Sequence, residues 1–121
     1  MFVIWAQVES KMMADILGTI TGKPWDVETY HKAGERIFNL EKCFNYREGF
    51  RRHDDSLPDR FFEEPLTFGP HKGAILKRDE LEKALDSYYA GRNWDPKTTK
   101  PSQEKLASLG LDFAWEEIKN I

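Results

Sequence analysis

The residue types that most often carry out chemistry are scattered along this chain. His31, His53 and His71 lie too far apart for a local metal motif, and none stands in the HExxH arrangement that binds zinc from one helix face. They would have to converge from separate elements to form a site. We therefore interpret one of them as partly exposed and two as surface residues, and we expect no metal site.

The carboxylates and the thiol are equally poor candidates for catalysis. The acidic doublets are adjacent residues, which point apart on a regular element and do not make a general acid and base pair. They are Asp54-Asp55, Glu63-Glu64 and Glu116-Glu117. Cys43 is the only cysteine, so the chain forms no internal disulfide and lacks the several thiolates of an iron–sulfur cluster or structural zinc site. Its position near an apolar helix face predicts a buried, unreactive thiol.

Length and composition bound the class of protein. The 121 residues suffice for one domain with its own core, and a charged share of 32% with a hydrophobic share of 40% is typical of a soluble globular chain. The net charge of −3 excludes a strong attraction to nucleic acid or an anionic membrane. The basic cluster 51–53 precedes Asp54 and Asp55, so we interpret it as a solvated helix end. A single cysteine is typical of a reducing, cytoplasmic compartment.

The longest segment with one unbroken period runs from Trp25 to Asp55. Its larger apolar residues are spaced by three and four, which predicts an apolar stripe along a helix over about 27–50. The stripe consists of Tyr30, Ala33, Ile37, Leu40 and Phe44. Asp26 is placed to cap the first turn. We interpret the stripe as a core face, so that Ile37→Ala and Leu40→Ala would each cost about 2–5 kcal/mol of stability.

The same register brings the stripe to Arg47, whose guanidinium either reaches out of a buried face or holds a carboxylate there. Three further helices are predicted, over 10–21, 78–91 and 102–109. Their inward residues are expected to be Met12, Met13, Ile16, Leu17 and Ile20 in the first, and Leu81, Ala84, Leu85 and Tyr88 in the second. Leu106 and Leu111 occupy the positions that meet in a Schellman ending, and another helical turn or two is expected after it.

Residues 56–76 form a crossing rich in proline and glycine that ends helices and enforces an irregular path. The residues expected to anchor it, over this domain's core or that of a neighbour, are Phe61, Phe62, Leu66 and Phe68. The GPHKG segment within it lacks the spacing of a phosphate-binding loop and is interpreted as a turn. The fold class that follows is all-α: a small irregular helical domain of four to five helices with a long crossing.

The chain opens on MFVIWA, which is apolar from its first position. This segment is too short to span a membrane and lacks the layout of a signal peptide. We expect residues 1–9 to be the lead-in of a longer chain cut at this point, and residues 1–121 to form a single helical domain.

The run GERIFNLEKCFNYREGFRRHDDSLPDRFFEEPL from Gly34 to Leu66 points to a family. It resembles the last domain of the tungsten-containing aldehyde:ferredoxin oxidoreductases, which typically carry GERxxNLExxFNxREGFxRxDDxLPxRFxxEP. The similarity continues in GPHKG, in the LxxxLDxYYxxRxWD pattern from Leu81 to Asp95 and in EKLxxLGL from Glu104 to Leu111. A match this long and ordered is far more specific than any short motif.

The resemblance implies an enzyme that oxidises aldehydes to carboxylic acids and passes two electrons through a [4Fe-4S] cluster to ferredoxin, using tungsten held by two pterin dithiolenes. In that family, three cluster cysteines sit in a CxxCxxxC group upstream, and the fourth ends a DxxG[LV]C motif just before the point where this chain begins. Neither motif is present here. The resemblance therefore implies no catalytic, cofactor-binding or metal-binding residue in this chain, and no cofactor of its own.

Two interpretations remain open. The chain is either the C-terminal portion of a tungsten or molybdenum oxidoreductase, inactive alone, or a free-standing helical interaction domain or split subunit that has kept the fold without the enzyme. In the first case its partners are the remaining domains, with ferredoxin as the partner of the whole enzyme. We also expect Phe2, Val3, Ile4 and Trp5 to join two copies in a symmetric homodimer, because burying exposed apolar area drives association.

Overall fold

The computed structural model describes residues 9–121, so most of the predicted lead-in and the apolar segment 2–5 lie outside the described residues. Within this range the chain is α-helical, with no strand beyond one isolated bridge between Trp94 and Pro101. The elements are α1 (Ser10–Thr21), α2 (Val27–Arg47), the 3-10 turn η2 (Arg52–Asp54), α3 (Arg60–Glu63), α4 (Arg78–Gly91), α5 (Gln103–Ser108) and α6 (Asp112–Ile118). The predicted all-α class is confirmed: α6 is the helical turn or two expected after α5, and α3 is a short helix that was not predicted.

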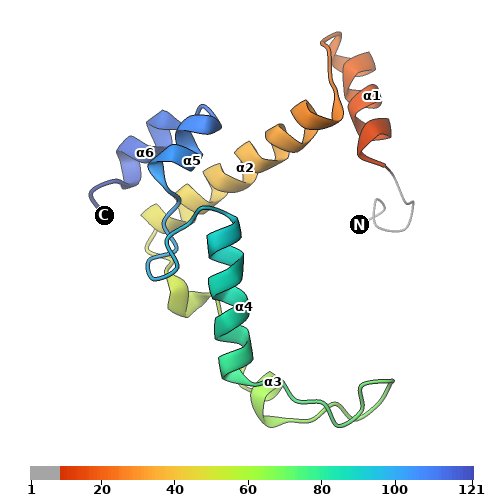
Figure 1. Ribbon diagram of the computed structural model, residues 1–121, viewed down its shortest axis with the longest axis vertical. Coiled ribbons are helices and arrows are strands. Elements are labelled where there is room, and N and C mark those ends of the chain that lie inside the picture. The colour runs from red at the N-terminus through yellow and green to blue at the C-terminus, as the bar shows by residue number, and fades with distance from the viewer. Residues whose placement is uncertain (1–8) are drawn as a thin grey trace.

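The long helix α2 carries the other elements (Figure 1). α1 lies beside its first turns, whereas α5 and α6 lie beside its second half. The C-terminal end of α4 reaches the same half of α2, and the loop after α3 extends away from the body at the opposite end of α4. The elements nearest the C-terminus therefore pack on a helix from the first half of the chain.

Local residue types explain where α2 begins and ends. Asp26 accepts a hydrogen bond from the Thr29 N–H at 2.7 Å and caps the first turn as predicted. The helix ends before the predicted residue 50 because Gly49 takes a φ of +99° and the Phe50 N–H donates to the Asn45 carbonyl at 3.0 Å. A glycine is required here because a side chain is strained in this left-handed backbone conformation.

The core lies where α5 and α6 pack against the second half of α2. It consists of Cys43, Tyr46, Leu106, Leu109, Leu111, Ala114 and Ile118. α5 ends in the predicted Schellman motif, since Gly110 has a φ of +64° and the Leu111 N–H donates to the Leu106 carbonyl at 2.9 Å. This turn sends the chain into α6 and leaves Leu106 and Leu111 fully buried on either side of it.

The predicted burial of the α2 stripe is wrong for its second half. Ile37, Leu40 and Phe44 are 60%, 40% and 56% exposed. The buried residues of α2 are instead Asn39, Cys43 and Tyr46. Both sets recur at helical spacing, so the period identifies the helix without identifying the face that α5 and α6 cover.

The predicted inward faces of α1 and α4 need similar correction. In α1, Met12, Ile16 and Ile20 are exposed, Met13 and Leu17 are half-buried, and only Ala14 is buried. In α4, Leu81 and Leu85 are half-buried, Ala84 and Tyr88 are exposed, and Tyr89 is the buried residue. In both helices the buried residue, Ala14 or Tyr89, directly follows a predicted one, so the covered face is turned by about 100° from the predicted face.

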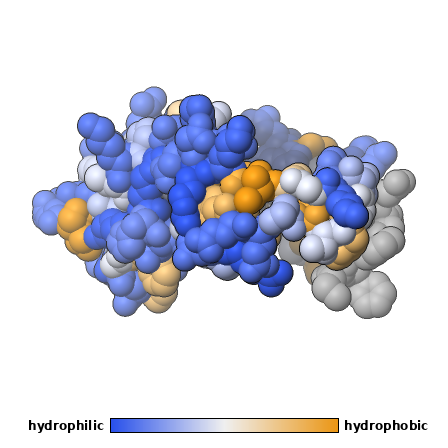
Figure 2. Space-filling view, turned by 90° about the horizontal axis from the view of Figure 1, so that it is seen from below, coloured by the Kyte–Doolittle hydropathy of each residue, from blue (hydrophilic) through white to orange (hydrophobic). Residues whose placement is uncertain are grey.

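The 56–76 crossing is largely irregular, as predicted, but it does not cover the core. Phe61, Leu66 and Phe68 are 49%, 52% and 82% exposed. Figure 2 looks along the molecule from this end and shows apolar residues in a hollow bordered by hydrophilic ones. The crossing is held by its own backbone, in which the Gly73 N–H donates to the Leu66 carbonyl at 2.8 Å. Only Phe62 of the expected anchors is half-buried, with the Arg78 guanidinium 4.2 Å from its ring centroid.

Candidate functional site

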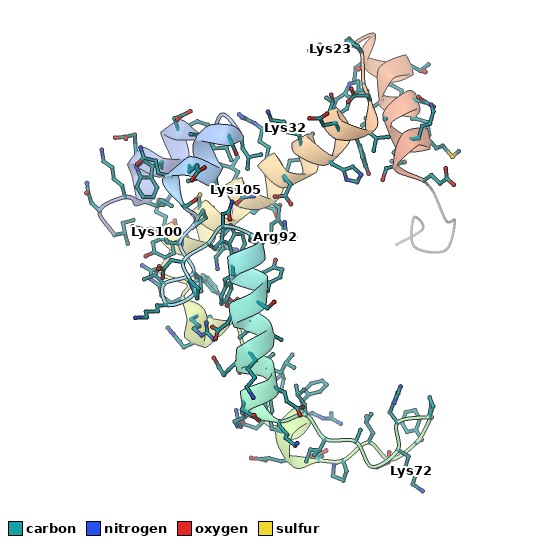
Figure 3. The ribbon with its side chains drawn as sticks, viewed as in Figure 1. Lys23, Lys32, Lys72, Arg92, Lys100 and Lys105 are labelled. Carbon is teal, nitrogen blue, oxygen red and sulfur yellow. The ribbon has the colours of Figure 1, made fainter. Side chains whose placement is uncertain are left out.

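The polar residues of the Gly34–Leu66 run gather where α2, α4 and α5 meet. Glu35 accepts a hydrogen bond from Arg92, just after α4, and forms an ion pair with Lys105 of α5, whose Nζ lies 2.9 Å from its carboxylate. Figure 3 shows Arg92 and Lys105 beside the same part of α2. The hydrogen bond from Lys105 and the two positive charges hold the pKa of Glu35 below its usual value. The ionised Glu35 carboxylate therefore connects α2 to α5 and to the C-terminal end of α4.

Arg36 performs a capping function from the next position of α2. Its Nη1 donates to the carbonyls of Leu109 and Gly110 at 2.5 and 2.8 Å. These carbonyls follow the last turn of α5, where backbone acceptors lack partners within the helix. The guanidinium thus ties the end of α5 to α2 across more than seventy residues of sequence.

Asn39 is fully buried in the middle of α2 and makes a long-range side-chain contact. Its Oδ1 accepts a hydrogen bond from Trp94 Nε1 at 2.9 Å, and its Nδ2 donates to the Glu35 carbonyl at 2.8 Å. The Trp94 ring stacks on Phe38 with centroids 5.7 Å apart. A buried amide of this kind holds the indole in one position because both of its polar atoms are hydrogen-bonded within the protein.

We predicted that the basic cluster 51–53 would be a solvated helix end. This is wrong, because two of its three side chains bind other parts of the same chain. Arg52 contacts Glu82 at 2.5 Å, Asp86 at 2.6 Å and the Pro96 carbonyl at 2.6 Å. The hydrogen bonds from Arg52 to both α4 carboxylates raise the pKa of its guanidinium. This residue therefore clamps η2 onto α4 and the 95–100 loop.

Arg51 is the second bound member of the cluster. Its guanidinium lies 3.8 Å from the Tyr46 ring centroid and donates to the Tyr46 carbonyl at 2.6 Å. His53 alone is exposed in the predicted way. Neither alternative left open for Arg47 is correct, because both placed it on a buried face: its Nε lies 3.1 Å from a carboxylate oxygen of neighbouring Glu48, and both side chains are nearly half exposed. That pair lies at the surface.

A cleft of about 390 Å³ lies between α2 and α4 and is lined in part by Tyr89, whose hydroxyl has a raised pKa. The Tyr89 hydroxyl donates to Asp55 at 2.6 Å, and Lys42 Nζ lies 3.6 Å from the same carboxylate oxygen. Burial and the neighbouring Asp55 carboxylate raise the pKa of Tyr89, so its hydroxyl stays protonated near neutral pH. It can donate a hydrogen bond there but cannot act as a general base.

A second hollow, of about 290 Å³, runs between α2 and α6, and we call it the α2–α6 groove. Its residues are Leu40, Cys43, Phe44 and Arg47 of α2 and Phe113, Ala114, Glu117 and Ile118 of α6. Its lining is almost entirely apolar, with one cation and one carboxylate at the edge. It has no arrangement of nucleophile, base and orienting group, so its surface is suited to packing rather than to chemistry.

A family model described as aldehyde ferredoxin oxidoreductase, domains 2 and 3, matches residues 1–111. The chain belongs to the aldehyde ferredoxin oxidoreductase family. It is 41% identical over 98 residues to the tungsten-containing aldehyde ferredoxin oxidoreductase of Pyrococcus furiosus, and 39% identical over 99 residues to that of Pyrococcus horikoshii. The matches cover 80% and 81% of the chain but 16% of each relative. The resemblance inferred from the sequence is confirmed, and the chain spans about a sixth of these relatives' length.

The donor residues of this family member do not fit a tungsten or iron–sulfur group. Among residues 9–121, no three His, Cys, Asp or Glu side chains gather closely enough to hold a metal ion. His31, His53 and His71 are all exposed and lie on separate segments, so two surface histidines were predicted correctly and the expectation that one would be only partly exposed is wrong. None of the helices in this range is both long and apolar enough to cross a membrane.

Cys43 is the only thiol, and its burial raises the pKa of that thiol to about 11. We expect a thiol-specific disulfide reagent at pH 8 to label it at once in denaturant but only slowly in the native chain, because thiolate is the reactive form. A raised pKa also makes this group's contribution to stability complete below pH 9 and lost as the pH rises from 9 to 11. Cys43→Ala should flatten that part of the stability profile. Rapid native labelling at pH 8 would contradict the buried position.

Sequence reasoning missed the structural work of Arg36, Asn39 and Arg52, although all three belong to the run that carries the family resemblance. The available signal was weak: Asn39 is a polar residue one position from the apolar stripe, and an amide there is either exposed or specifically bonded. The identity of the partner is not encoded locally, because Trp94 and Glu82 lie on elements far along the chain.

Proposed function

We propose that this chain is the C-terminal structural portion of a tungsten or molybdenum pterin, iron–sulfur aldehyde:ferredoxin oxidoreductase. The whole enzyme oxidises aldehydes to carboxylates in the cytoplasm and transfers electrons to ferredoxin. Within it, residues 1–121 act as one helical domain that contributes no catalytic, cofactor-binding or metal-binding side chain. Its partners are the remaining domains of the oxidoreductase.

The observation that carries this proposal is that the polar residues of the Gly34–Leu66 run bind other parts of the same domain. Glu35, Arg36, Asn39 and Arg52 bond to helices and connecting loops elsewhere in the same domain, so they support the scaffold. The surface left over is apolar along the second half of α2. A large exposed apolar area on a small domain indicates a surface that another part of a protein covers.

Co-expression tests this proposal directly. The chain would be produced with the part of the Pyrococcus furiosus relative that lies outside the 98 matched residues, with a tag on the chain only. We expect the two to co-purify, and aldehyde-dependent reduction of an artificial electron acceptor to require both. A chain that never co-purifies with this part would favour the alternative of a free-standing interaction domain.

The chain alone should contain no stoichiometric tungsten, molybdenum or iron after purification. This expectation follows from its single buried thiol and from the lack of grouped ligands among residues 9–121. Metal analysis by mass spectrometry, together with the visible absorbance spectrum, is the measurement. About four irons per chain, the content of one [4Fe-4S] cluster, would overturn the proposal that the cofactors belong to other domains.

We further propose that isolated copies pair through Phe2, Val3, Ile4 and Trp5. These residues are consecutive and apolar, and a patch that faces its own copy closes with two-fold symmetry. Light scattering at about 100 µM, where micromolar contacts are populated, should report a dimer for the full chain and a monomer for a version without residues 1–6. A monomer in both cases would exclude this pairing.

A further inference from the structure

The two walls of the α2–α6 groove run in the same direction. Arg36 near the middle of α2 bonds the carbonyl of Gly110 before α6, and the Tyr46 hydroxyl near the end of α2 lies 3.4 Å from the Ile121 carbonyl after α6. Parallel walls lined by apolar residues every three or four positions match the outer face of a third helix. The groove floor contains the small residues Cys43 and Ala114, which permit a close approach.

The groove continues a packing surface that is already in use within the domain. Tyr30 and Ala33 belong to the same stripe of α2 and are half-buried in its first turns, beside which α1 lies (Figure 1). The stripe then continues through Leu40 and Phe44, which are 40% and 56% exposed. One half of the stripe is therefore next to a helix and the other half is open. Phe113 of α6, 57% exposed, widens the open half.

We propose that the α2–α6 groove receives an amphipathic helix from the part of the oxidoreductase outside this chain, an inference that rests on the proposed function. The relatives contain most of their length outside the matched region, because the match spans 16% of each. The charged residues at the groove edge, Arg47 and Glu117, determine which charge the bound helix should carry there. Arg47 is paired with Glu48, whereas Glu117 forms no ion pair with any of residues 9–121. The occupant therefore places a lysine or arginine beside Glu117 and apolar residues at i, i+3 or i+4, and i+7 on the groove.

Overlapping synthetic peptides provide the test. Peptides of about 20 residues, each long enough for a 30 Å helix, would cover the Pyrococcus furiosus relative outside its matched region. Each would be titrated into the isotope-labelled 121-residue chain and followed by NMR chemical shifts. We expect a peptide with the stated apolar spacing and a basic residue to shift the amide signals of 37–47 and 112–118, and to gain helicity on binding.

Single substitutions separate the groove from other exposed apolar surfaces. Phe44→Ser and Phe113→Ser should each weaken binding by about tenfold or more, as expected for aromatic anchors. Phe68→Ser is the matched control, because Phe68 is 82% exposed on the distant 56–76 crossing and should leave affinity unchanged. Glu117→Gln should weaken binding and reduce its dependence on salt. Since Phe44 and Phe113 are both more than half exposed, the variants should fold, and thermal melting followed by circular dichroism checks this.

The experiments distinguish a failure of the groove inference from a failure of the proposed function. If the chain co-purifies with the rest of the oxidoreductase but the peptides shift only 56–76, or none shifts the groove, the groove inference is wrong and the proposed function stands. Loss of co-purification as well contradicts both. A dimer of the chain alone that Phe44→Ser dissociates would assign the groove to a second copy instead.

Discussion

Leu111→Ala is expected to lower the free energy of unfolding by about 2–5 kcal/mol, the range observed when a large buried aliphatic side chain is truncated. Leu111 is fully buried between the turn after α5 and the start of α6, and it belongs to the cluster that joins both helices to α2. Its removal leaves a cavity at the centre of the only core cluster found in residues 9–121. Urea unfolding followed by far-ultraviolet circular dichroism measures the change.

Ile37→Ala is the matched control on the same folding unit. Its side chain is 60% exposed, so the expected loss is below about 1 kcal/mol, and the better helix propensity of alanine offsets part of it. This replaces the cost of 2–5 kcal/mol that the apolar stripe predicted for a core position. Equal losses for Leu111→Ala and Ile37→Ala would mean that the stripe is covered in solution.

Asn39→Leu should destabilise the chain by about 1–3 kcal/mol, because it leaves a buried donor without a partner. The donor is Trp94 Nε1–H, which now bonds Asn39 Oδ1 at 2.9 Å in a buried environment. Leucine has the branched shape of asparagine but a larger volume, so overpacking at this buried site adds to the cost of the lost hydrogen bonds. Asn45→Leu on the exposed side of α2 should change stability far less. Denaturant midpoints for the two variants give the comparison.

A double-mutant cycle isolates the contribution of the hydrogen bond. Trp94→Phe removes the donor, so Asn39→Leu should cost about 1–2 kcal/mol less in that background than in the native chain. Strict additivity of the two substitutions would show that the Asn39 to Trp94 bond does not form in solution, and that the cost of Asn39→Leu comes from packing alone.

The helices themselves could be predicted from local residues. Asp26 and Ser102 cap the helices that they precede, at 2.7 and 3.1 Å from the backbone N–H groups of Thr29 and Lys105. The glycine ending of α5 was also predictable, because its apolar contact and its left-handed residue lie within a few positions of each other. These features depend on interactions inside one or two turns, which the sequence displays directly.

The buried faces could not be predicted in the same way. Which side of α2 is covered depends on α5 and α6, whose residues follow about sixty positions later, as the bond from Arg36 to Leu109 illustrates with a separation of 73. Cys43 was correctly predicted as a buried thiol, since a small apolar residue beside the stripe suits a helix contact. Ile37 and Phe44 were assigned to the core because of their size and helical spacing. These features lead to burial only where another element covers that face of the helix.

The polar part of the candidate site was less predictable still. Arg52 looked like one member of a solvated basic cluster, because its partners Glu82 and Asp86 belong to another helix and give no local sign of the contact. The family resemblance identified the run that contains these residues, but it left their roles as scaffold contacts to the structure.

The contacts of Arg36 and Tyr46 with residues before and after α6 have a consequence for synthesis. Their partners are 73 to 75 positions downstream, so α2 leaves the ribosome long before the segment that covers its inner face exists. Until α6 has been synthesised, Cys43 and Tyr46 are open to water and to chaperones, and non-local closure of this kind is slow compared with helix formation. A premature stop anywhere before α6 would therefore release a chain with a formed helix and an unclosed core, which is a substrate for proteolysis.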